Sequence, residues 1–446
     1  MRSEWESLTF GELIKLGELD IGDGYRAKND ELGGGGLIFL RAGHVADSHI
    51  DFNGTDRFQT TNEQKFGAKI SRSGDVVVTT KGNSTGRLAF VTPSMPRFVY
   101  SPHLSYWRAS AAGRLNQSFL RAWSRCSEFS VQLAALSRST DMAPYLSLTD
   151  QRRLRITIPP KKTQCWIGSL NDDFDARLEL LRETSLSLEA IAQTLFKSWF
   201  VDFDPVRAKA EGREPEGMDA ATAALFPSEF EESELGLVPK GWRPTRVGDV
   251  VTMVKGRSYK SAELEDSDVA LVTLKSFNRG GGFRRDGFKP YTGTYRDDQV
   301  VSEGECIVAF TDVTQQAELI GRTAIVTGSQ KCGRLVASLD VGILRPKMAS
   351  LTPAFLRALL SGERYVGHIK GYTTGTTVLH LAKTGLPSYL FVLPPDELIA
   401  SWQRIGGACI ERQALNVRKI DLLTDLRDTL LPRLISGKLR LPEAVA

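Results

Sequence analysis

The chain has 446 residues, of which 41% are hydrophobic and 25% are charged, with a formal net charge of +4. These values are typical of a globular protein with two or three domains, and they permit nucleic-acid binding without requiring it. Five cysteines without a Cys-x-x-Cys pair argue against a zinc site or a disulfide framework, and no apolar run of about 18 residues predicts a membrane span. Because the N-terminus also has no apolar leader, we expect a cytoplasmic protein that does not bind membranes.

The first half of the chain is predicted to form strands, then helices. Runs of β-branched residues such as 76–80 are broken by glycine, which indicates short strands joined by tight turns. A helical stretch is expected over 117–136, and the double proline 159–160 follows it. A long helix is then expected over about 167–200, ending before Pro205 because the residue ahead of a proline avoids the helical region.

The second half repeats the first in the same order. The segment FLRA at 119–122 returns at 355–358, and the double proline 159–160 returns at 394–395. Several further blocks recur at nearly the same offset, which predicts a duplicated, pseudo-symmetric protein. Between the copies, the segment 209–239 is rich in Ala, Glu, Gly and Pro, and we expect it to be a solvated linker.

The two long helices carry matching apolar stripes at three- and four-residue steps. Pro432 is expected to kink or end the second helix because it lacks an amide hydrogen. The residues predicted to pack the helices together or against partners are Leu181, Leu188, Ile191, Leu195, Trp199, Phe200, Ile420, Leu423, Leu430 and Leu434.

The sequence carries none of the motifs expected of a catalytic site. It has no phosphate-binding Gly-x-x-x-x-Gly-Lys-Ser/Thr loop, no Gly-x-Ser-x-Gly elbow and no His-Glu-x-x-His motif. The five histidines have no metal-ligand spacing, so we predict neither a catalytic residue nor a metal site. A duplicated chain without catalytic residues favours recognition or scaffolding.

Basic, polar and aromatic residues on glycine-rich loops are the candidate DNA contacts, because side chains and backbone can both approach phosphates and bases there. The alternative is that these glycines only form hairpin turns. The candidates are Tyr25, Arg26, Lys28, Lys81, Asn83, Ser84, Arg87, Arg257, Tyr259, Lys260, Arg284, Arg285, Thr311, Gln315, Gln316, Thr374 and Thr376.

Three segments resemble the specificity subunits of Type I restriction-modification systems. The segment 188–206 (LEAIAQTLFKSWFVDFDPV) resembles their central conserved region, and 430–439 (LLPRLISGKL) resembles the distal one. The segment 374–381, with its Thr-Gly-Thr-Thr start, resembles the motif that closes their target-recognition domains. The first copy departs from the pattern at 139–146 and follows its double proline with two lysines, which weakens a residue-by-residue transfer between copies.

The resemblance implies a mixed α/β fold with two pseudo-symmetric target-recognition domains joined by two long antiparallel coiled-coil helices. The implied parts are a first domain at 1–165, a spacer helix at 166–204, a linker at 205–240, a second domain at 241–395, a spacer helix at 396–437 and a tail at 438–446.

By the same resemblance, each domain reads one half of a bipartite, asymmetric site on double-stranded DNA. The helices dock two methyltransferase subunits, and restriction–translocase subunits join the complex. S-adenosylmethionine, ATP and Mg are used by those partners, and no cofactor is expected in this chain. The alternatives are a specificity module from a fused restriction-methylation enzyme and a scaffold that does not bind DNA.

Overall fold

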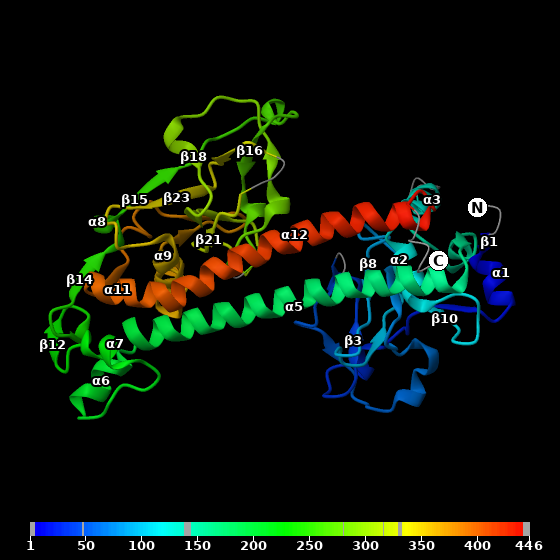
Figure 1. Cartoon of the computed structure of the whole chain (residues 1–446), viewed down its shortest axis with the longest axis horizontal. Helices are drawn as coiled ribbons and strands as arrows, with labels where there is room; N and C mark the ends of the chain where they lie inside the picture. Colours follow the sequence, from blue (N-terminus) through cyan, green and yellow to red (C-terminus); the bar gives the residue numbers. More distant parts are fainter. Residues whose placement is uncertain are drawn as a thin grey trace. The chain divides into compact units, whose positions relative to one another are not determined.

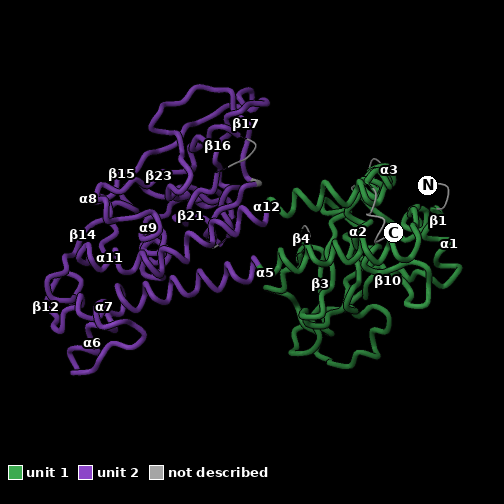
Figure 2. The backbone as a smooth tube through the Cα atoms, in the orientation of Figure 1, with its two compact units in different colours: residues 1–180, 421–446 green, residues 181–420 purple. Residues whose placement is uncertain are grey.

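The computed structural model describes residues 5–46, 49–137, 144–279, 281–314, 316–328 and 332–439. The chain divides into two compact units, residues 1–180 with 421–446 and residues 181–420 (Figure 2). Each unit contains an α/β module and half of each of two long helices (Figure 1). The units therefore divide both helices in the middle, whereas the sequence predicts domain boundaries at the helix ends.

Unit 1 is built on a four-stranded antiparallel sheet of order β2-β10-β7-β8. Strand β7 has the sequence VVVT and is buried along its whole length, as β-branched residues on a central strand favour. The strands are β2 (Leu19–Asp23), β10 (Leu104–Ala109), β7 (Val76–Thr79) and β8 (Leu88–Phe90).

Unit 2 repeats this sheet strand for strand, in the order β15-β23-β19-β21. Equal strand order and equal direction in the two units agree with the predicted duplication. The strands are β15 (Val251–Lys255), β23 (Val341–Pro346), β19 (Cys306–Ala309) and β21 (Thr323–Ile325).

Smaller sheets are also repeated. In each unit, a short strand has an antiparallel neighbour on one side and a parallel neighbour on the other. These strands are β6 (Asp56–Arg57), β3 (Ile38–Leu40) and β9 (Phe98–Tyr100) in unit 1, and β17 (Lys289–Pro290), β16 (Val269–Val272), β22 (Arg334–Ala337) and β18 (Val300–Val301) in unit 2. The closing pairs are β1 (Glu6–Thr9) with β11 (Arg155–Ile158), and β14 (Arg243–Arg246) with β26 (Leu390–Leu393).

Equivalent helices begin at equivalent caps. The side chain of Asn116 accepts the Phe119 amide at 2.9 Å, and that of Thr352 accepts the Phe355 amide at 3.1 Å, so each satisfies an amide in the first turn. The stretch expected as one helix over 117–136 is two helices, because the first ends at Ser124. The module helices include α1 (Phe10–Lys15), α2 (Gln117–Ser124), α3 (Ser127–Ser137) and α4 (Leu148–Gln151), and α8 (Val247–Val250), α9 (Pro353–Leu359) and α10 (Glu363–Gly371).

The first long helix, α5 (Lys161–Phe200), starts directly after the double proline and spans 40 residues, about 60 Å at 1.5 Å per residue. The second consists of α11 (Asp396–Trp402), a π-helical turn at Gln403–Gly407 and α12 (Ala408–Ile435). The expectation that Pro432 kinks or ends this helix is wrong about its end, since α12 continues to Ile435. Pro432 lies in the last turn, where few helical hydrogen bonds remain to be lost.

Each unit buries the half-helices in its own core. In unit 1, Ile167 of α5 and Leu434 of α12 belong to one buried cluster with Trp107 and Trp123. In unit 2, Phe196 of α5 packs at ring-centroid distances of 5.1 Å from Phe355 and 5.5 Å from Trp402. Such burial contributes about 1.5–3 kcal/mol for each large apolar side chain.

The segment 205–240 is folded, although the sequence suggests a solvated linker. It contains α6 (Asp204–Ala210), α7 (Ala220–Ala224) and a hairpin of β12 (Phe230–Ser233) and β13 (Gly236–Pro239). Val206, Phe226 and Val238 are buried in the core of unit 2. The prediction rested on the Ala, Glu, Gly and Pro content of the segment and gave no weight to its few large apolar residues.

Candidate nucleic-acid interface and helix seam

The candidate DNA-contacting residues of unit 1 lie largely at one end of its four-stranded sheet. Strands β2 and β7 both run antiparallel to β10, so the segments that follow them emerge at the same end. Both segments are hydrogen-bonded to the chain just before β10. The Tyr25 amide donates to the Tyr100 carbonyl at the end of β9 at 2.6 Å, and the Thr80 amide donates to the His103 carbonyl in the following connection at 2.9 Å. The predicted contact residues exposed here are Arg26, Lys28, Lys81, Asn83 and Arg87.

The loop between β7 and β8 is held in place by the segment that follows the undescribed residues 138–143. The Gly82 amide donates to the Pro144 carbonyl at 3.0 Å, and the Thr85 hydroxyl donates to the same carbonyl at 2.9 Å. The backbones of Lys81 and Tyr145 form an isolated antiparallel β-bridge. Gly82 adopts φ 83°, a left-handed conformation that favours glycine. Ser84 is half-buried, so it faces solvent less than Lys81 does.

The equivalent end of the unit 2 sheet carries the second set of candidates. Here β15 and β19 run antiparallel to β23, and the Arg257 amide donates to the Ala337 carbonyl at 2.7 Å while that of Phe310 donates to Asp340 at 2.8 Å. The predicted contact residues exposed on the segments at this end are Lys260, Gln316, Thr374 and Thr376.

Unit 2 replaces the first loop by a different one. Strand β20 (Thr311–Asp312) pairs with β25 (Leu379–Leu381), which pairs with β24 (Thr373–Thr374), so the predicted contacts Thr311 and Thr374 come together in one small sheet. Thr311 is buried and its hydroxyl donates to Asp340 at 2.8 Å, which places it at the base of the loop. Gln315 lies outside the described residues.

Asp312 organises this loop. Its carboxylate accepts the amides of Thr314 at 2.6 Å, Leu319 at 2.5 Å and Ile320 at 2.9 Å. Burial opposes ionisation, but these amide hydrogen bonds outweigh it and lower the pKa of Asp312. Ala317 has φ 54°, a strained conformation for a residue with a Cβ atom. The anchored loop leaves Val313 exposed.

The two sheet ends share a scaffold that the sequence comparison did not reveal. Gly24 and Gly256 occupy equivalent positions after β2 and β15, and a Cβ atom on either would lie about 2 Å from a backbone carbonyl, that of Ser101 or Ser338. Only glycine allows this approach. His103 is exposed on the same connection in unit 1, and it is a candidate contact that the sequence analysis missed.

Exposed lysines also repeat. The amide of Lys28 donates to Glu31 at 2.8 Å, and that of Lys260 donates to Glu263 at 2.7 Å, so the two side chains project from the same kind of turn. The neighbouring predicted tyrosines have partners already.

Tyr25 and Tyr259 are half-buried. The hydroxyl of Tyr25 donates to Glu31 at 2.9 Å, and that of Tyr259 accepts from Lys289 at 2.9 Å. Arg257 and Arg285 are also half-buried, while Arg284 is exposed on the segment that follows Phe283.

The helix seam differs in one respect from the predicted stripe. Ile191 is 51% exposed, and the neighbouring Ala192 is the buried residue at this point of α5. Of the other nine predicted packing residues, four are buried and five are half-buried, so the stripe is right in direction but one residue off here. The buried ones are Leu181, Trp199, Phe200 and Leu434; the half-buried ones are Leu188, Leu195, Ile420, Leu423 and Leu430.

No described helix is both long and apolar enough to cross a bilayer. No group of three or more His, Cys, Asp or Glu side chains among the described residues is arranged to hold a metal ion.

Two α/β modules of equal topology on a shared helix pair define the architecture of specificity subunits. The S subunit of the Type I restriction-modification system of M. genitalium has this fold, with a TM-score of 0.51, 15% identity and 96% of each chain covered. No family profile matches the chain.

The specificity subunit of the Type I restriction enzyme HindI from Haemophilus influenzae is 26% identical over 423 residues, which cover 83% of this chain and 88% of that protein. The MjaIX specificity subunit of Methanocaldococcus jannaschii is 24% identical over 302 residues, 67% of this chain and 64% of that protein. The predicted resemblance to Type I specificity subunits is thus confirmed.

Proposed function

We propose that this chain is the DNA-reading subunit of a Type I restriction-modification complex, and that each sheet end reads one half of a bipartite site on double-stranded DNA. The observation that carries the proposal is the equivalence of the two sheet ends. Their scaffolds match down to Gly24 and Gly256, while the loops that they present differ in sequence and structure. A common frame with different loops suits two half-sites of different sequence.

The two loops offer different chemistry to base edges. The unit 1 loop presents Lys81, Asn83 and Arg87, whereas the described part of the unit 2 loop presents Val313 and Gln316. Lysine and arginine suit the acceptors of guanine, an amide suits adenine, and an apolar side chain suits the thymine methyl group. We therefore expect a half-site containing guanine for unit 1 and one rich in A·T pairs for unit 2.

The helices supply the partner surface in this proposal. Two methyltransferase subunits dock on them and methylate adenines, and restriction–translocase subunits join through the complex. S-adenosylmethionine, ATP and Mg serve those partners, and this chain contributes recognition only. A DNA-free scaffold is the competing function, and binding of duplex DNA by the purified chain at about 150 mM salt separates the two.

A domain exchange tests the proposal. Replacing residues 8–156 by the matching segment of a relative, in the complex with methyltransferase, is expected to change one half of the methylated site and leave the other intact. Methylated adenines are then mapped across the host genome. Change in both halves together would mean that the two modules do not read independently.

A further inference from the structure

The helix seam contains buried polar contacts in both units. In unit 2, Asn416 of α12 is 1% exposed and donates to the Ser185 hydroxyl of α5 at 3.3 Å. Gln413 donates to the Ser185 carbonyl at 3.2 Å. A buried amide in an apolar helix seam specifies which helix it pairs with, because a wrong partner leaves it without a hydrogen bond.

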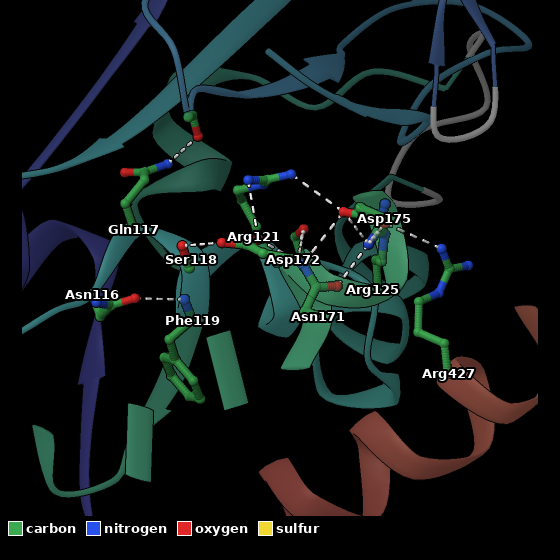
Figure 3. A network of polar contacts seen from close by, with 12 residues as sticks. Asn116, Gln117, Ser118, Phe119, Arg121, Arg125, Asn171, Asp172, Asp175 and Arg427 are labelled. Atoms are coloured by element: carbon green, nitrogen blue, oxygen red, sulfur yellow. Dashed lines mark hydrogen bonds and ion pairs between the residues drawn. The ribbon is translucent and has the colours of Figure 1, made fainter. Parts of the chain in front are cut away.

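In unit 1 the polar contact is ionic. Arg427 of α12 lies 3.6 Å from the Asp175 carboxylate of α5, and its side chain is 7% exposed (Figure 3). Asp175 is also paired with Arg125 of the α/β module at 2.8 Å, and Arg125 donates to Asn171 at 2.7 Å. Arg427 has a second acid, Asp428, on its own helix at 2.8 Å.

The second copy of each position carries an apolar residue. The double prolines place the copies 235 residues apart, so Asp175 corresponds to Ile410 and Arg427 to Ala192. Ile410 and Ala192 are both buried in the core of unit 2. The same helix crossing is therefore ionic in one unit and apolar in the other.

The polar contact of unit 2 also has apolar residues at the equivalent positions. Ser185 corresponds to Ile420, and Asn416 corresponds to Leu181, at the same offset of 235 residues. At the positions that would face Arg427 and Asn416 in a like pair, α12 carries Ile410 and Ile420, so these two residues have polar cross-helix partners on α5 and not on a second α12.

Pairing of like helices from two chains would break both contacts. Two α12 helices would set Arg427 against Ile410 and Asn416 against Ile420, so a guanidinium and an amide would lose their cross-helix partners in the seam. Two α5 helices would be tolerated better. Ser185 donates to the Leu181 carbonyl of its own helix at 2.8 Å, and Asp175 keeps Arg125.

We propose that Arg427 and Asn416 are the residues that restrict α12 to the α5 helix of the same chain and exclude pairing with a second copy. The consequence rests on the function proposed above. Exclusive pairing joins two different readers in every molecule, so the complex recognises an asymmetric site. Paired like helices would instead join identical readers and create symmetric sites.

The test gives α12 the residues that α5 carries at these positions. The double variant Asn416→Leu/Arg427→Ala removes from α12 the two polar groups that a like pair would leave without a cross-helix partner. Full-length chains, one batch isotope-labelled, are unfolded in urea, mixed and refolded at high protein concentration. Native mass spectrometry then counts dimers that contain one labelled and one unlabelled chain. Arg412→Ala, which removes an exposed arginine from the same helix, is the matched control.

We expect the mixed-dimer fraction of the double variant to exceed that of the wild type and of the control at least about tenfold, since each unpartnered buried polar group disfavours a state by about that factor. Asn416→Leu alone should give an intermediate fraction, and it carries the test if circular dichroism shows the double variant unfolded. A folded variant that stays monomeric like the control overturns the proposal. If the wild-type complex methylated no bipartite site, the proposed function would be contradicted. The mixed-dimer fraction would still test the pairing proposal.

Discussion

Arg108 and Arg345 hold equivalent positions in the two units. Each lies on an inner strand of its sheet and pairs with the acid that directly precedes the neighbouring inner strand, Arg108 with Asp75 at 2.6 Å and Arg345 with Glu305 at 2.7 Å. Both arginines also donate to backbone carbonyls of the segment beside the sheet, Arg108 to that of Ile70 at 2.5 Å. The two units thus share a buried or half-buried ion pair as well as their apolar strands.

The two ion pairs differ in burial, and this predicts different energetic effects. Arg108→Met leaves Asp75, which is 1% exposed, without its cation and should lower the free energy of unfolding of unit 1 by about 3–5 kcal/mol. Arg345→Met removes a pair whose arginine side chain is 33% exposed, so we expect a loss of about 1 kcal/mol or less. Urea unfolding measures both, and equal losses would contradict the argument from burial.

Asp312 predicts a pH-dependent loop. Because its folded pKa is lowered, its stabilising contribution is complete above the unfolded pKa of about 3.9 and is lost as the pH falls through the folded pKa. At neutral pH, Asp312→Asn should cost about 1–3 kcal/mol, since an amide cannot accept all three backbone hydrogens as a carboxylate does. The variant should also weaken recognition of the unit 2 half-site alone.

The difference in unfolding free energy between wild type and Asp312→Asn should shrink as the pH is lowered below about 4. Glu318→Gln, a substitution at a partly exposed acid of the same loop, is the control and should leave both stability and half-site preference near wild type. A difference that is constant with pH would show that the Asp312 charge does not hold the loop.

Lys28 and Lys260 are expected to contact phosphates. Their equivalent placement on matching turns belongs to the common scaffold, which suits contacts that carry no sequence information. Lys28→Gln should weaken DNA binding uniformly across sequences and reduce the slope of log affinity against log salt concentration by about 0.9. Gln316→Ala should instead relax one half-site with little change in slope. A changed base preference for Lys28→Gln would contradict its assignment to the backbone.

The long helices could be predicted from sequence because they rest on periodic apolar residues, which the folded chain buries. The repeat could be predicted because its sequence blocks recur in the same order at nearly one offset. The polar residues of the seam could not. A search for an apolar stripe passes over Asn416 and Arg427, and only their contacts across the seam reveal that they are buried. The same search selected Ile191 where the small Ala192 packs, because pattern alone does not decide between neighbouring positions at a close helix crossing.

The sheet ends were partly predictable for a similar reason. Glycine-rich loops led to segments that the structure brings to one end of each sheet, but the connection with His103 has no distinctive composition. Its place beside the loop follows from strand direction, which depends on pairing between residues 25 or more positions apart, since Leu104 pairs with Thr79 (104 − 79 = 25).

The last prediction concerns the spacing between half-sites. Glu183 of α5 and Arg418 of α12 occupy equivalent positions, 235 residues apart. Four residues inserted after each of them add one turn to both helices while keeping Asp175 opposite Arg427 in unit 1 and Ser185 opposite Asn416 in unit 2. The insertion adds about 6 Å and a rotation of about 40°. One base pair of DNA rotates by about 35°, so the complex should methylate sites with a spacer longer by one or two base pairs and with both half-sites unchanged.

Insertion into α5 alone shifts one helix past the other by a turn, so it should separate Asn416 from Ser185 and reduce assembly with methyltransferase. Methylome mapping reads the spacer and both halves at once, and an unchanged spacer in the double insertion would show that these helices do not set it.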